Sequence, residues 1–99
     1  MGNSKHDRIA ERVAKRVGGE YNPDRGADVA GGGQVTEVEV DPGKLKEGIR
    51  QLQGYKQPRY LAVPNELVPE AKEATRGTQI GVRTETGRIV KPARRPGGR

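Results

Sequence analysis

Apolar residues recur at helical spacing in three segments of the chain, and capping or turn residues bound each segment. The first segment starts at Ser4 and stops at Gly18, with the apolar stripe Ile9, Val13, Ala14 and Val17. The second covers about residues 44–55 after a turn at residues 41–43, with the stripe Leu45, Ile49 and Leu52. The third starts at Asn65 and stops at Gly77, with the apolar positions Leu67, Val68, Ala71 and Ala74. The pattern therefore predicts three helices.

Segments rich in β-branched and alternating residues predict strands between and after these helices. A short strand is expected at residues 20–22, followed by a hairpin of residues 26–30 and 34–40. A further strand covers residues 59–63, and a last hairpin pairs residues 79–84 with residues 88–90. Residues 1–91 thus form one domain. Residues 92–99, which are rich in Arg, Pro and Gly, are expected to be a disordered basic tail.

The glycine turn inside the first hairpin sets which side chains face one another. If Gly32-Gly33 forms the two-residue turn that such a pair favours, Asp28 lies opposite Glu37. By the same register, Glu39 lies opposite Gly26, so the three carboxylates share one face of the hairpin. The other face carries side chains suited to packing on helices, namely Ala27, Val29, Thr36, Val38 and Val40.

Carboxylates that lie side by side on a sheet repel each other by roughly 0.2–1 kcal/mol per directly opposed pair. The cluster of Asp28, Glu37 and Glu39 therefore calls for solvent or for a compensating cation. Mg²⁺ is a natural candidate, because it prefers carboxylate oxygens and keeps several waters. Two interpretations remain open at this point, a metal site and the solvated outer face of an ordinary hairpin.

Composition limits the size of the core and the class of partner. The chain has 99 residues, of which 30% are hydrophobic and 3% aromatic, so the core is thin and a homodimer would extend it. The net charge of +6 favours a polyanionic partner such as nucleic acid. The absence of cysteine excludes disulfides and zinc–thiolate sites. No apolar run is long enough to span a membrane, so we expect a cytoplasmic protein, and we expect His6 to be a surface residue.

The order helix, three strands, helix, strand, with acidic residues on the second and third strands, resembles the core of the PD-(D/E)xK nuclease superfamily. The resemblance covers most of residues 5–63, and the chain is similar to the branch of archaeal Holliday-junction resolvases and RecB-type nucleases. It implies an α/β (α+β) protein with a restriction-endonuclease-like αβββαβ core. In that fold a mixed central sheet is flanked by helices, and this chain would add a helix and a C-terminal hairpin.

The resemblance also implies a cofactor and site residues. Glu11, Asp28 and Glu37 match the positions that bind a divalent metal, Mg²⁺ or Mn²⁺. Gln51 and Tyr55 reproduce the Gln-x-x-x-Tyr signature of RecB-type members, and Lys44, Gly48, Gln51 and Tyr55 share one side of the second predicted helix. These matches imply a metal-dependent endonuclease that acts on phosphodiester bonds of duplex or branched DNA.

One position departs from the family pattern. Glu39 stands where most members have the lysine that helps to position the attacking water. It could be an additional metal ligand or accept a proton from that water. Lys44 is the candidate substitute for the missing lysine and Lys46 is less well aligned, while an ordinary solvated lysine at a helix start also explains Lys44.

Two other functions stay open on the sequence alone. Loss of the motif lysine favours a catalytically inactive nucleic-acid-binding or assembly module with the same fold. The third interpretation is a protein-interaction adaptor whose basic charge serves solubility. DNA binding without metal would indicate the binding module, and indifference to both DNA and metal would indicate the adaptor.

Overall fold

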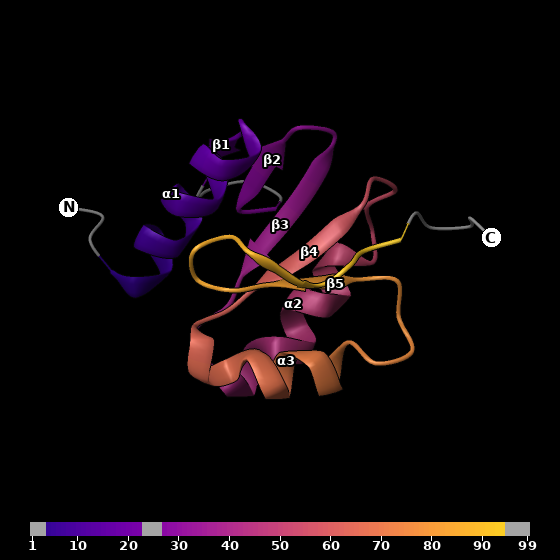
Figure 1. Cartoon of the computed structure of the whole chain (residues 1–99). Coiled ribbons are helices and arrows are strands. Elements are labelled where there is room, and N and C mark those ends of the chain that lie inside the picture. The colour runs from indigo at the N-terminus through magenta and orange to yellow at the C-terminus, as the bar shows by residue number, and fades with distance from the viewer. Residues whose placement is uncertain (1–3, 23–26, 95–99) are drawn as a thin grey trace.

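A computed structural model describes residues 4–22 and 27–94 of the chain. Six strands in these residues form one mixed sheet, and their order in the sheet is their order in the sequence (Figure 1). The strands are β1 (Glu20–Tyr21), β2 (Val29–Gly31), β3 (Gln34–Val38), β4 (Arg59–Ala62), β5 (Gly81–Arg83) and β6 (Ile89–Lys91). β1, β2 and β3 are antiparallel, β3, β4 and β5 are parallel, and β6 returns antiparallel to β5.

Three α-helices within the described residues connect or flank these strands. They are α1 (Lys5–Val17), α2 (Leu45–Leu52) and α3 (Val68–Ala74). α2 joins β3 to β4 and α3 joins β4 to β5, as parallel neighbours require a crossover connection. The predicted mixed α/β class and the sheet flanked by helices are therefore confirmed.

The predicted ends of α1 are those of the structure. The Ser4 side chain accepts a hydrogen bond from the Asp7 backbone N–H at 3.1 Å, so one of the free donors of the first turn is satisfied. Gly18 ends the helix with φ of 70°, a left-handed conformation that glycine adopts without a side-chain clash.

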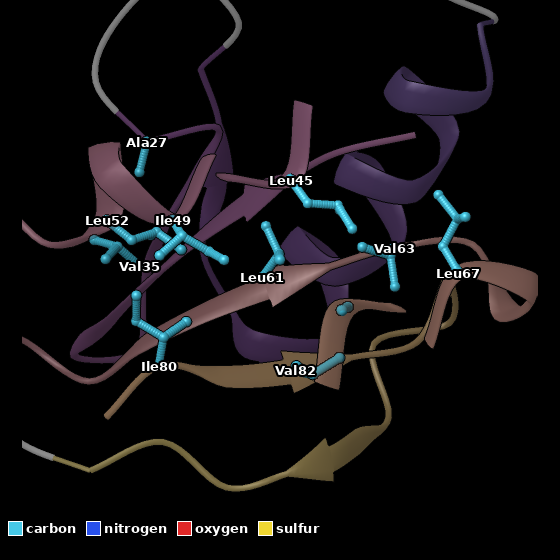
Figure 2. Packing of buried hydrophobic residues seen from close by; sticks show 11 residues of the cluster. Ala27, Val35, Leu45, Ile49, Leu52, Leu61, Val63, Leu67, Ile80 and Val82 are labelled. Atoms are coloured by element: carbon cyan, nitrogen blue, oxygen red, sulfur yellow. The ribbon is translucent and has the colours of Figure 1, made fainter. Parts of the chain in front are cut away.

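Different helices cover the two faces of the sheet. Leu61 and Ala62 are consecutive on the central strand β4, so their side chains point to opposite faces. Ala62 packs with α1 residues in one cluster, whereas Leu61 packs with residues of α2 and α3 in the other, which Figure 2 shows. Both residues are fully buried. The sheet thus lies between α1 on one side and α2 with α3 on the other.

Element boundaries differ from the predicted ones by a few residues. β3 ends at Val38 rather than at residue 40, and β6 covers Ile89–Lys91 rather than residues 88–90. The second and third helices each begin with a turn of 3₁₀-helix, Pro42–Lys44 and Asn65–Leu67. Pro69 lies in the first turn of α3, where a missing N–H costs no helical hydrogen bond.

Part of the predicted basic tail belongs to the described residues. The Arg94 backbone N–H donates to the Gln79 carbonyl at 2.8 Å, so the chain at that point lies beside the residues that precede β5. Residues 95–99 lie outside the described residues, as does Gly26 of the first predicted hairpin.

Candidate carboxylate site

The turn between β2 and β3 has the predicted two-residue form. Gly32 and Gly33 have φ of 64° and 76°, the left-handed values that a primed turn requires at both positions. The strands pair Val29 with Thr36 and Gly31 with Gln34, which is the predicted register. One residue beyond the Val29–Thr36 pair, this register places Asp28 opposite Glu37.

Close backbone contact fixes the place of this hairpin against the end of α1. A Cβ atom on Gly31 would lie 2.2 Å from the Gly19 Cα, far inside van der Waals contact. Two glycines thus allow β2 to run directly along the link between α1 and β1.

Backbone N–H groups link the Asp28 segment to β3 near Glu37. The Asp28 N–H donates to Glu37 Oε1 at 3.3 Å, and the Val38 N–H donates to Asp28 Oδ2 at 2.9 Å. Asp28 is 9% exposed and Glu37 is 7% exposed, so both carboxylates have left most of their hydration.

Burial and the nearby charges raise the pKa values of the two glutamates, Glu37 and Glu39. Burial, and secondarily the charge of Asp28, raises the pKa of Glu37 to about 7. The same two causes, in the same order, raise the pKa of Glu39 to about 6. Asp28, Glu37 and Glu39 therefore interact as one cluster at the end of β3.

The expected division of the hairpin into two faces is wrong at Ala27. Its side chain packs with Val35, Ile49 and Leu52 under α2, not with Val29 under α1 (Figure 2). The chain bends at residues 27 and 28, before the β2 ladder begins at Val29, so strand alternation does not extend to Ala27.

α2 contributes to the site through residues of its predicted polar row. The Tyr55 hydroxyl, just beyond the helix, accepts a hydrogen bond from the Ala27 N–H at 2.7 Å and so holds the residue before Asp28. A Cβ atom on Gly48 would lie 3.0 Å from Glu39 Cγ, so the missing side chain leaves room for Glu39. The positive charge of Lys44 partly offsets the upward shift of the Glu39 pKa. Gln51 and Lys46 are exposed on α2.

His6 belongs to the cluster, although the sequence reasoning placed it at the surface. Its side chain is 32% exposed, and Nε2 lies 3.1 Å from Asp28 Oδ2. Nδ1 lies 3.4 Å from the Tyr21 hydroxyl, which donates to Asp7 Oδ1 and thereby lowers the pKa of Asp7. Helical spacing places His6 on the side of α1 that carries the buried Ile9 three residues later, but it does not indicate the contact with Asp28.

Glu11 lies elsewhere on α1. It is exposed, and it lines a hollow on the outer side of the helix with Arg8, Arg12 and Lys15. Across residues 4–22 and 27–94, no group of three or more His, Asp or Glu side chains is placed to hold a metal ion. Glu11, Asp28 and Glu37 therefore do not form a three-ligand set in this structure.

The donor chemistry of the remaining pair fits a hard cation. Mg²⁺ is often bound by one or two protein carboxylates and completes its shell with water and phosphate oxygens. Asp28 and Glu37 are such a pair, and their neighbour Glu39 adds a third source of negative charge.

None of the helices in the described part of the chain has the length and apolar character that crossing a membrane requires. Comparisons of the chain with protein-family models, with curated proteins and with solved structures found no match.

Proposed function

We propose that this protein is a metal-dependent DNA endonuclease-like protein that acts on phosphodiester bonds of duplex or branched DNA. The observation that carries the proposal is the buried pair Asp28 and Glu37, held by bonds from the Val38 and Asp28 N–H groups, with Glu39 close enough for the charges to interact. Such a concentration of negative charge favours binding of a divalent cation.

The arrangement of elements also supports this function. α1, three antiparallel strands, α2 and a parallel fourth strand follow in the order that the resemblance to PD-(D/E)xK nucleases implies. The two helices pack on opposite faces of the sheet, and the acids lie on the second and third strands or next to them.

Each residue of the cluster has a distinct role in this proposal. Asp28 and Glu37 would hold the cation, which when bound polarises a phosphate oxygen and lowers the pKa of a water. Glu39, with a pKa of about 6, is mostly ionised at neutral pH and can accept a proton from the attacking water. Tyr55 is a positioning residue, because it holds Ala27 next to Asp28.

The test is cleavage of labelled linear duplex and four-way-junction DNA in Mg²⁺ or Mn²⁺. Cutting that requires metal and is lost in Glu37→Gln is the expected result. Glu70→Gln, an exposed change on α3, is the matched control and should cut like the wild type. Wild-type protein that is folded and cuts neither DNA in either metal would refute the proposal.

A second candidate is the inactive nucleic-acid-binding module. It is favoured by Glu39 at the lysine position and by the bonds that already occupy Asp28 Oδ2, from the Val38 N–H and toward His6. DNA binding that is unchanged by EDTA, without cleavage in any metal, would assign this function.

A further inference from the structure

The outer side of α1 carries a row of basic side chains. Arg8, Arg12 and Lys15 line a hollow of about 360 Å³, and Glu11 is the single acidic residue in its lining. Arg8, Arg12 and Lys15 follow one another at intervals of four and three residues, so they lie on one side of the helix.

The opposite side of α1 is buried in the hydrophobic core. Ile9, Ala10, Val13 and Ala14 are buried against the sheet, and Val17 is packed beside them. α1 therefore has no free apolar side with which to enter a membrane surface or an apolar groove. Arg12 and Lys15 are exposed on this side beside Glu11, so a partner of the outer side is expected to be polar and negatively charged.

The length of the row suits the repeat of a nucleic-acid backbone. Seven residues separate Arg8 from Lys15, which is about 10 Å at a rise of about 1.5 Å per residue. Successive phosphates on one strand of duplex DNA rise by about 3.4 Å along the axis, so the row spans about three of them.

His6 contacts Asp28 but lies two residues before Arg8, so their side chains are on different sides of α1 and the basic row is separate from the carboxylate cluster. We propose that the outer side of α1 binds the phosphate backbone of duplex DNA. This inference rests on the proposed function for its choice of DNA as the polyanion.

The test compares two pairs of substitutions that remove the same charge. Arg12→Gln with Lys15→Gln neutralises the proposed surface, and Arg50→Gln with Lys72→Gln neutralises exposed residues of α2 and α3 on the other face of the sheet. All four positions are exposed, and both pairs should keep the thermal midpoint of the wild type. Binding of a fluorescent duplex is measured by anisotropy in EDTA, from about 50 to about 200 mM salt.

The expected result is a change in salt dependence. The plot of log K against log salt should lose about 1.8 from its slope in the α1 pair, at about 0.9 per lost phosphate contact, and nothing in the control pair. The single change Lys15→Gln should lose about half as much, which keeps the test valid if the double variant folds poorly. Equal losses in the two pairs, or an unchanged slope in the α1 pair, would overturn the inference.

The outcome is separable from the proposed function. If the wild type cuts DNA in a metal-dependent way and the α1 pair keeps the wild-type salt slope, this inference is refuted and the proposed function is not. If the slope of log K against log salt falls in that pair and the wild type does not cut DNA, the inference is supported and the nuclease proposal is refuted.

Discussion

Replacing Glu37 with glutamine should make the protein more stable at alkaline pH. The folded state raises the pKa of Glu37 from 4.5 to about 7, because the side chain is buried and lies beside Asp28. The folded state therefore binds more protons than the unfolded state between these two values, and the free energy of unfolding falls as pH rises through this window. At about 1.4 kcal/mol per pKa unit, the loss is about 3 kcal/mol above pH 7.

Glutamine has nearly the shape of the protonated glutamic acid and keeps an oxygen that can accept from the Asp28 N–H. We expect Glu37→Gln to exceed the wild type by about 3 kcal/mol at pH 8, with the difference vanishing below pH 4.5. Urea denaturation followed by circular dichroism at a series of pH values measures both curves. Glu70→Gln, exposed on α3, should stay within about 0.5 kcal/mol of the wild type throughout.

The reasoning would be refuted by a Glu37→Gln curve parallel to that of the wild type from pH 4 to pH 8. Parallel curves would mean that Glu37 titrates alike in the folded and unfolded states. The description of Asp28, Glu37 and Glu39 as a buried, interacting cluster would then fail.

Three further predictions concern the scaffold of the site. Tyr55→Phe should cost about 1–3 kcal/mol in urea denaturation and speed amide exchange at Ala27, because the Ala27 N–H loses its acceptor; unchanged exchange would contradict this. Gly31→Ala should cost at least about 3 kcal/mol through its clash with Gly19, whereas Gly33→Ala, with open space around it, should cost only about 1–2 kcal/mol; equal thermal midpoints would argue against the close contact. Leu61→Ala should cost about 2–5 kcal/mol, and the exposed Ile89→Ala less than about 0.5 kcal/mol, in the same denaturation assay; a small loss at Leu61 would mean that the two-sided core is misplaced.

Local chemistry made much of the fold predictable. The cap at Ser4 and the turn at Gly32 and Gly33 act within a few residues, so the sequence suffices to place the start of α1 and the register of β2 with β3. Helical spacing also identified the buried stripes of α1 and α2 correctly.

The errors arise where a residue's environment is decided by a distant part of the chain. Ala27 faces α2 because the chain bends there and the hydroxyl of Tyr55 holds its N–H, which no local pattern encodes. His6 meets Asp28 because α1 lies across the hairpin end, a contact between residues 22 positions apart. The same packing leaves Glu11 on the outer side of α1.

The sheet has its strands in chain order, with α2 and α3 as the crossover connections between its parallel strands, and this has a consequence for synthesis. Each new strand follows its neighbour in the chain, so pairing can advance from β1 to β6 as the chain leaves the ribosome. At every stage, however, the most recently added strand forms an open edge of the sheet, opposite the edge formed by β1. Until β5 is made, that edge is β4, whose four residues are all buried in the finished sheet, so a pause in translation there would leave a strand edge open to pairing with another chain.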